Sequence, residues 1–166
     1  GELAYSLLLQ QEYPSWLYSV NKGATTIWEH WDGIKPDHTM WSPDMNSFNH
    51  YAYGAIGEWM YRVIAGIEID EKAPGYRHIL FAPKTGGNLT WAQGSFESVY
   101  GTVALRWEER KGKIFVTIRV PVNTTAQLIL EKEAHDPSGD LCMKQGEDGL
   151  FCAEIGSGTW TVSYLK

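Results

Sequence analysis

The sequence is poor in positive charge. It carries 14 Lys and Arg residues against 20 Asp and Glu residues, its formal net charge is −6, and its basic residues form no run. Proteins that bind nucleic acids carry a basic patch that neutralises phosphates. The composition therefore excludes nucleic acid as a partner and argues against polyanions in general. The sequence also has no apolar stretch long enough to cross a bilayer, so no membrane span is expected.

Cysteine is scarce as well, with two residues, Cys142 and Cys152, on either side of a turn rich in Gly and Asp. They could face each other across a hairpin, but two thiols identify no redox compartment and their spacing matches no metal motif. We expect both to be structural and reduced. No other group of His, Cys, Asp or Glu has the spacing of metal ligands, so neither a metal nor a cofactor is expected.

The first part of the chain is rich in tryptophan and reads as helical. Apolar residues recur at helical period over residues 3–12 and 47–64, and Pro14 is followed by a second short helix over residues 15–20. Residues 33–46 contain two prolines and no periodic signal, which predicts a long loop. These helices have too few partners to enclose a core, which suggests the end of a larger helical domain.

After residue 68 the apolar residues alternate in steps of two, which is typical of half-buried strands. Turns rich in Gly separate these segments, and short strands at regular spacing predict an antiparallel β-sandwich. The fold class is therefore α+β in two parts, with helices over residues 1–67 and a β-sandwich over residues 68–166. The predicted strands cover residues 77–81, 103–107, 114–120, 126–130, 150–152 and 160–164.

Residues 23–33, GATTIWEHWDG, combine a carboxylate, an imidazole and two indoles. Indole rings stack on the apolar face of a sugar, and charged groups accept hydrogen bonds from its hydroxyls. Glu29 could act as a base on a water molecule, or it could simply end an apolar run in solvent. His50 could donate to sugar hydroxyls or be a hydrogen-bonded structural histidine.

The tryptophans of this region leave the same choice open. Trp31 and Trp41 lie beside loop residues, where a sugar platform and a place in the core are equally compatible with the sequence. Trp28 follows an apolar segment, so it could equally be a tryptophan of the core.

The stretches YPSW at residues 13–16, GATTIWEHWDG at residues 23–33 and SFNHYAYGAIGEW at residues 47–59 together resemble the bacterial α-L-rhamnosidases. The resemblance implies the last helices of an (α/α)6 barrel followed by a β-sandwich, and an inverting glycoside hydrolase. It implies that Glu29 is the general base and that His50 contacts the sugar. Trp28, Trp31 and Trp41 are predicted to complete the substrate site. The implied partners are a rhamnose-containing glycoside or polysaccharide and the remainder of the barrel.

Nothing before Glu29 matches the general acid of that family. The chain is therefore expected to carry one half of a catalytic pair and to be inactive alone. The alternative is that the sandwich is a structural or carbohydrate-binding module attached to a helical-barrel glycosidase of other specificity. Its aromatic candidates are Trp91, Tyr100, Trp107 and Trp160, of which Trp107 and Trp160 alternate with the strands and are expected in the core.

Overall fold

The computed structural model describes all 166 residues, which form two compact units. The helical unit comprises residues 1–58 and 86–88, and the sandwich unit comprises residues 59–85 and 89–166. None of the helices is long and apolar enough to cross a membrane.

The helical unit begins with α1 (Glu2–Leu9) and α2 (Trp16–Asn21), which confirms the first two predicted helices. Helix α1 is shorter than predicted and ends before the bend at Tyr13-Pro14. At the start of α2, the Ser15 hydroxyl accepts a hydrogen bond from the Tyr18 N–H at 3.0 Å, which satisfies a main-chain donor that the helix leaves open. The two helices thus lead the chain into residues 23–33.

The predicted helix over residues 47–64 starts later than expected. It begins as the 3₁₀ turn η1 (Ala52–Ala55), continues as α3 (Ile56–Trp59) and ends as the wider π turn η2 (Met60–Ile64). The late start has a physical cause, because the main-chain groups of residues 47–50 bind residues 26–29 and are unavailable to a helix. His50 therefore precedes the helix, and its predicted place in the first helical turn is wrong.

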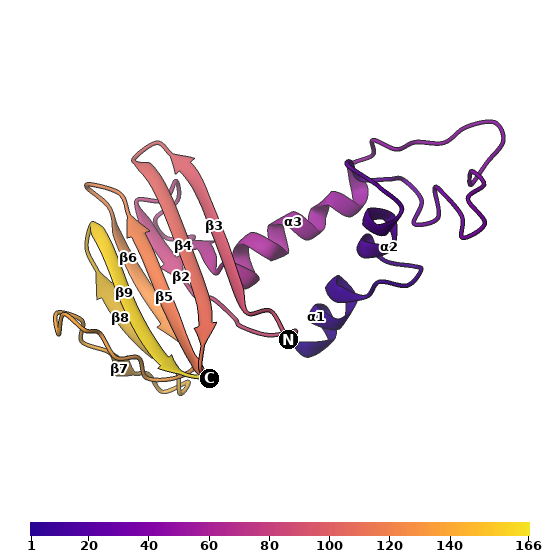
Figure 1. The fold of residues 1–166 in the computed structure, drawn as a ribbon. Helices are drawn as coiled ribbons and strands as arrows, with labels where there is room; N and C mark the ends of the chain where they lie inside the picture. Colours follow the sequence, from indigo (N-terminus) through magenta and orange to yellow (C-terminus); the bar gives the residue numbers. More distant parts are fainter. The chain divides into compact units, whose positions relative to one another are not determined.

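The sandwich unit contains two sheets, seen one behind the other in Figure 1. The first has the order β1-β2-β6-β8-β7 and the second the order β3-β4-β5-β9. The strands are β1 (Ile67–Ile69), β2 (His78–Phe81), β3 (Trp91–Ser98), β4 (Gly101–Arg110), β5 (Lys113–Val120), β6 (Thr125–Leu130), β7 (Lys144–Gln145), β8 (Phe151–Ile155) and β9 (Gly158–Leu165).

All strand pairs are antiparallel except one. Strands β2 and β6 run parallel, with His78 opposite Thr125 and Phe81 opposite Leu128. After β2 the chain forms three strands of the other sheet, β3, β4 and β5, and returns to the first sheet as β6, in the same direction as β2. The predicted sandwich is therefore antiparallel except at this one pair. Strands β1, β3 and β7 were missed by the sequence pattern. The fold class itself, helices followed by a β-sandwich, is confirmed.

The core of the sandwich is built from alternate residues of the strands, as the period of two predicts. Trp107 is completely buried, and its indole N–H donates to the carbonyl oxygen of Ile64 at 2.7 Å. The prediction for Trp160 is wrong, because this residue is only half-buried near the start of the edge strand β9. Completely buried side chains of the two sheets are Ile79, Phe81, Val103, Leu105, Trp107, Ile114, Val116, Ile118, Ala126 and Leu128.

Both cysteines are free thiols. Cys152 lies on β8 opposite Lys144, so the two thiols do not face each other across the β7–β8 hairpin. Burial raises the pKa of the Cys152 thiol, and the carboxylates of Asp148 and Glu154 add to the effect.

Candidate active site

Two stretches that the sequence singled out lie side by side in the helical unit. The Glu29 N–H donates to the Ser47 carbonyl oxygen at 3.0 Å, and the His50 N–H donates to the Ile27 carbonyl oxygen at 2.7 Å. The Thr26 hydroxyl adds a hydrogen bond to the carbonyl oxygen of Phe48. These bonds fix the main chain of Glu29 and that of His50 next to each other, and both residues remain partly exposed.

The imidazole of His50 is oriented by its neighbours. Its Nδ1 accepts a hydrogen bond from the Ala52 N–H at 3.3 Å, and its ring lies nearly parallel to that of Tyr51, with centroids 5.0 Å apart. A neutral imidazole whose Nδ1 accepts carries its proton on Nε2. The free ring nitrogen of His50 is therefore a hydrogen-bond donor.

His30 and Trp41 form a second ring pair. Their planes are 10° apart and their centroids are separated by 3.6 Å. The Trp41 N–H donates to the Gly33 carbonyl oxygen at 3.1 Å, so residues 33–46 fold back on the motif that precedes them. Trp41 is 39% exposed, which leaves indole surface available to a ligand.

Trp31 belongs to an aromatic cluster with Trp16 and Tyr53. The Tyr53 ring stacks on Trp31 at 3.8 Å, and the Trp16 ring meets it edge-on at 5.1 Å. The Trp16 indole N–H donates to the Tyr53 carbonyl oxygen at 2.9 Å. The cluster ties α2 and η1 to the motif, and it occupies one face of Trp31.

Trp28 is the most buried of the predicted site residues, with 6% of its surface exposed. It packs edge-on against Phe48 at 5.1 Å. A Cβ atom on Gly33 would lie 3.0 Å from both rings, so this close approach needs a glycine. The burial of Trp28 against Phe48 favours the interpretation of Trp28 as a core anchor next to Glu29 in the sequence.

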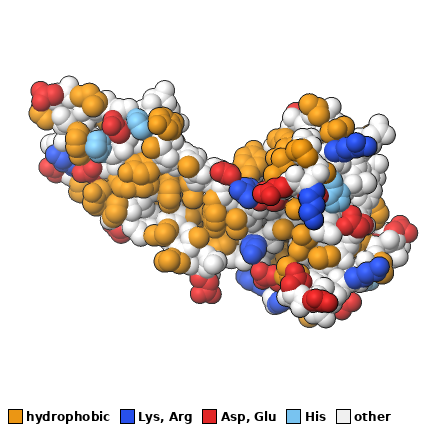
Figure 2. Space-filling view, turned by 180° about the vertical axis from the view of Figure 1, so that it is seen from behind, with side chains coloured by type: hydrophobic (Ala, Val, Ile, Leu, Met, Phe, Trp, Pro, Cys, Tyr) orange, Lys and Arg blue, Asp and Glu red, His pale blue; other side chains and the backbone are white.

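A pocket of about 260 Å³ lies over the aromatic cluster. Glu29, His50 and Trp41 do not line it, and most of its lining is apolar. It is formed by Trp16, Ser19, Val20, Ala24, Thr25, Thr26, Ile27, Trp28, Trp31 and Tyr53. Hydrophobic side chains also gather on the surface of this unit (Figure 2). Leu3, Leu7 and Val20, all in this unit, are each more than half exposed.

The acidic residues near the motif are held by local hydrogen bonds. The Thr39 hydroxyl and N–H both donate to the Asp37 carboxylate, at 2.7 and 3.0 Å, and hold the pKa of that carboxyl below its usual value. Asp37 is therefore a turn residue, whose carboxylate binds the chain two residues on. Burial raises the pKa of Tyr18, and the charges of Asp32 and Asp37 act in the same direction. No group of His, Cys, Asp and Glu side chains lies close enough together to hold a metal ion.

Sequence reasoning missed the partners that hold the site. The Ser47 and Ile27 carbonyl oxygens act through the main chain, which no side-chain pattern reveals. The stacking of the Tyr53 ring on Trp31 joins residues 22 positions apart, which no local pattern reveals. Gly54 and Ala55, the small residues that follow Tyr53, were the available sequence signal for close packing around Tyr53.

Comparisons with known proteins cover both units. Residues 1–64 match the bacterial alpha-L-rhamnosidase 6 hairpin glycosidase domain, and residues 66–140 match the bacterial alpha-L-rhamnosidase C-terminal domain. An alpha-L-rhamnosidase of Streptomyces avermitilis is 45% identical over 163 residues, which is 95% of this chain and 15% of the relative. One of Formosa agariphila is 47% identical over 130 residues, or 76% of this chain and 14% of the relative.

Solved structures agree with these matches. The Streptomyces avermitilis alpha-L-rhamnosidase complexed with L-rhamnose has a TM-score of 0.87 at 42% identity and matches 98% of this chain and 16% of its own. The native enzyme of Aspergillus terreus has a TM-score of 0.80 at 34% identity, with 98% and 17% covered. The chain thus spans less than a fifth of the length of these relatives.

Proposed function

The chain belongs to the bacterial α-L-rhamnosidase family, and we propose that it supplies the general base and part of the sugar site of an enzyme that removes terminal α-L-rhamnosyl residues. The substrate class is a rhamnose-containing glycoside or polysaccharide. The observation that carries the proposal is the hydrogen-bonded pairing of residues 26–29 with 47–50, which brings Glu29 and His50 together within the region that matches the family's glycosidase domain.

Inverting hydrolysis needs two carboxyl groups on opposite sides of the sugar, roughly 6.5–9.5 Å apart. One protonates the departing oxygen, and the other removes a proton from the water that attacks the anomeric carbon. Glu29 performs the second role. Its N–H is held by the Ser47 carbonyl oxygen, which limits how far the carboxylate can drift from the attacking water.

The other residues orient the sugar. His50 donates through Nε2 to a hydroxyl, because its Nδ1 is already occupied by the Ala52 N–H. Trp41 offers indole surface on which the apolar face of the sugar can stack, and Trp28 and Trp31 flank Glu29 and His30 in the motif. The remainder of the barrel supplies the general acid and the rest of the pocket, and its surface covers the apolar pocket over Trp16 and Trp31.

The test is the hydrolysis of an aryl α-L-rhamnoside by the complete polypeptide that contains this chain. Glu29→Gln keeps the size of the side chain and removes the base, so kcat/KM should fall by at least about a thousandfold, which is about 4 kcal/mol. Glu12→Gln is the matched control, because Glu12 lies in an exposed part of the same unit.

A second measurement separates loss of the base from structural damage. In Glu29→Ala, azide needs no deprotonation and fits where the carboxylate and water stood, so it should restore turnover and yield a glycosyl azide of inverted configuration. Near-normal turnover by Glu29→Gln would remove the catalytic role of Glu29. Failure of azide rescue in a folded Glu29→Ala variant would count against the base role in particular.

A further inference from the structure

The outer face of the β3-β4-β5-β9 sheet carries an ordered row of side chains that the proposed active site does not use. Alternate residues of β4 and β5 are buried, as in Val103, Leu105 and Trp107, and the residues between them point away from the core. We call this surface the outer sheet face. It includes Trp91, Arg106, Glu108, Arg110, Phe115 and Arg119.

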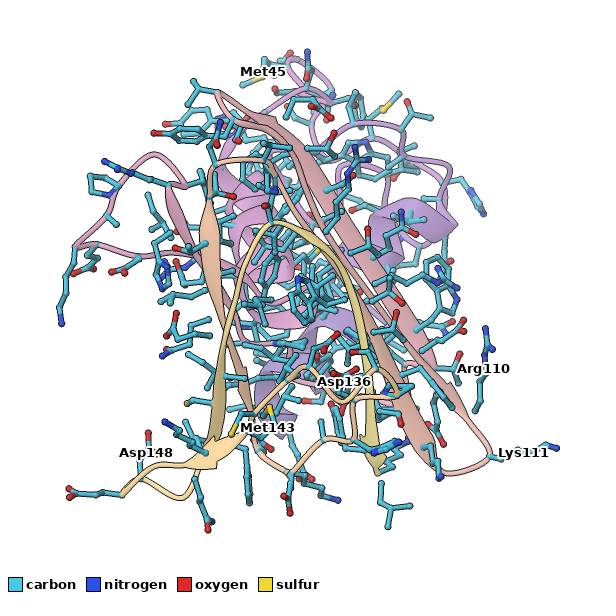
Figure 3. The ribbon with its side chains drawn as sticks, turned by 90° about the vertical axis from the view of Figure 1, so that its left-hand side faces the viewer. Met45, Arg110, Lys111, Asp136, Met143 and Asp148 are labelled. Atoms are coloured by element: carbon cyan, nitrogen blue, oxygen red, sulfur yellow. The ribbon has the colours of Figure 1, made fainter.

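Cations and aromatic rings alternate along this face. The Arg106 guanidinium lies over the Trp91 ring at 5.0 Å and forms an ion pair with Glu108 at 3.0 Å. Glu108 also pairs with Arg110, whose guanidinium lies 5.7 Å from the centre of the Phe115 ring. Figure 3 shows Arg110 extending outward beside the β4–β5 turn at Lys111. These ion pairs and cation–π contacts hold the side chains in place, while Trp91 remains 56% exposed.

The face continues into a pocket of about 270 Å³ at its other end. Tyr100, Thr102, Arg119 and Thr159 line it, together with main chain and apolar residues of the neighbouring turns. Arg119 is exposed and forms no ion pair, so its five N–H donors are available. Such a pocket can bind a planar carboxylate through the guanidinium.

The distance between Trp91 and the pocket is greater than the length of one sugar ring. Arg119 shares a row with Ala104 and Ser95, and Ser95 is four residues from Trp91 along β3. That spacing corresponds to roughly 14 Å along the strands and about 10 Å across two of them. A ligand that contacts both must therefore be an oligomer.

The charge of the face differs from that of the whole chain. Its cations are Arg106, Arg110, Lys113 and Arg119, and its carboxylates are Glu97 and Glu108, whereas the chain as a whole has a net charge of −6. The expectation against polyanionic partners rested on the total charge and on the absence of a run of basic residues, and neither reveals this local excess of cations. A positive face with an exposed indole favours a ligand that is both anionic and made of sugars.

We propose that the outer sheet face binds an anionic polysaccharide that contains uronic acids. Trp91 stacks on one sugar ring, and Arg119 forms a bidentate pair with a carboxylate of another. The row of residues between their two rows on the same face carries Gln93, Arg106 and Thr117. The surface is separate from Glu29 and its role does not depend on that of Glu29. It would hold a polymeric substrate to the enzyme.

The test uses the complete polypeptide and measures its retardation in native gels that contain polygalacturonate, neutral dextran or dextran sulfate. We expect retardation by polygalacturonate, weakening as salt is raised, and none by dextran. Trp91→Ala and Arg119→Ala should each reduce the affinity at least tenfold. Arg77→Ala is the matched control, since Arg77 is an exposed arginine without an ion pair that precedes the other sheet.

Three results would overturn the proposal: no retardation of the unmodified protein, equal affinity in Trp91→Ala and Arg119→Ala, or an equal loss in Arg77→Ala. Retardation by dextran sulfate that is as strong as by polygalacturonate and insensitive to Trp91→Ala would also overturn it, because attraction of any polyanion would then suffice. Hydrolysis of an aryl rhamnoside, measured on the same variants, should not change. Absence of that hydrolysis in the unmodified protein would instead reject the proposed function.

Discussion

The main-chain N–H of His50 donates to the carbonyl oxygen of Ile27, 2.7 Å away and two residues before Glu29. This bond joins two segments that are separated by a loop of more than a dozen residues. It sets the position of the proposed base, Glu29, relative to the proposed sugar contact, His50, through the main chain, which side-chain substitutions leave in place. A loss of activity on replacing either side chain therefore reports the loss of its chemical group and not a displacement of the main chain.

Replacement of His50 by alanine removes the Nε2 donor. In the complete polypeptide, kcat/KM for an aryl α-L-rhamnoside should fall by about tenfold to a hundredfold, the range for loss of one or two hydrogen bonds to a sugar. His38→Ala is the control, because His38 is an exposed residue of the neighbouring loop. An unchanged kcat/KM in His50→Ala would reduce His50 to a structural role.

The isolated chain of 166 residues should not hydrolyse an aryl α-L-rhamnoside. It carries one of the two carboxyl groups that inversion requires, and the apolar pocket over Trp16 and Trp31 is open. The measurement is a long incubation of the purified chain beside the complete polypeptide. A rate that disappears in Glu29→Gln would contradict the expectation, because the chain would then hold its own acid.

Trp107 should be the residue of the sandwich most sensitive to a conservative change. Trp107→Phe removes the N–H that satisfies the Ile64 carbonyl oxygen and leaves space in a fully buried site, so the free energy of unfolding should fall by about 2–4 kcal/mol. Trp91→Phe, at an exposed position, should cost less than about 1 kcal/mol. Urea unfolding of the chain, followed by far-ultraviolet circular dichroism, compares the two.

Gly66 and Gly112 provide a second matched pair. Both have positive φ angles, +70° and +76°, so alanine is strained at either position by about 1 kcal/mol. A Cβ atom on Gly66 would also overlap the main chain of Ala82 and Pro83, whereas one on Gly112 meets nothing within 4 Å. Gly66→Ala should therefore destabilise the chain by about 2 kcal/mol more than Gly112→Ala. Equal midpoints of urea unfolding would contradict the close approach of Gly66 to Pro83.

Burial raises the pKa of Tyr164 to about 12, against an ordinary value of 10.0, although a hydrogen bond with Thr85 lowers it in part. The folded chain thus keeps a proton that the unfolded chain loses. The associated stability is fully present below pH 10.0 and is lost as the pH rises toward 12. The loss should not exceed about 2 kcal/mol, since Tyr164 is only half-buried and water screens part of the effect. Tyr164→Phe should flatten the unfolding free energy between pH 10 and 12, and an unchanged slope would refute the assignment.

Much of the fold could be predicted from the sequence because local pattern and burial agree. Val103, Leu105 and Trp107 alternate with polar residues, and that period places them in a core without knowledge of strand order. Ser15 marks the start of α2, and Gly23 follows its end, for reasons that lie within a few residues. Glu29 and His50 were predicted as site residues from the motifs that resemble the rhamnosidase family, and that assignment stays a prediction.

Other features depend on partners that are distant in sequence. The late start of the helix at Ala52 follows from hydrogen bonds between residues 26–29 and 47–50, and the parallel pairing of β2 with β6 follows from the path through the second sheet. The stacking of Trp31 on Tyr53 and of His30 on Trp41 likewise depends on how the chain folds back.

The sequence by itself determined which residues alternate, where α2 begins, and which motif contains the carboxylate and imidazole, because each of these is set by neighbours along the chain. The tertiary structure decided which face of Trp31 is covered, that Trp28 is buried against Phe48, and that four cations share one sheet face with Trp91 in an acidic chain. The physical reason is that hydrogen bonds and ring contacts between distant segments, together with the register of the strands, set what each side chain meets in space.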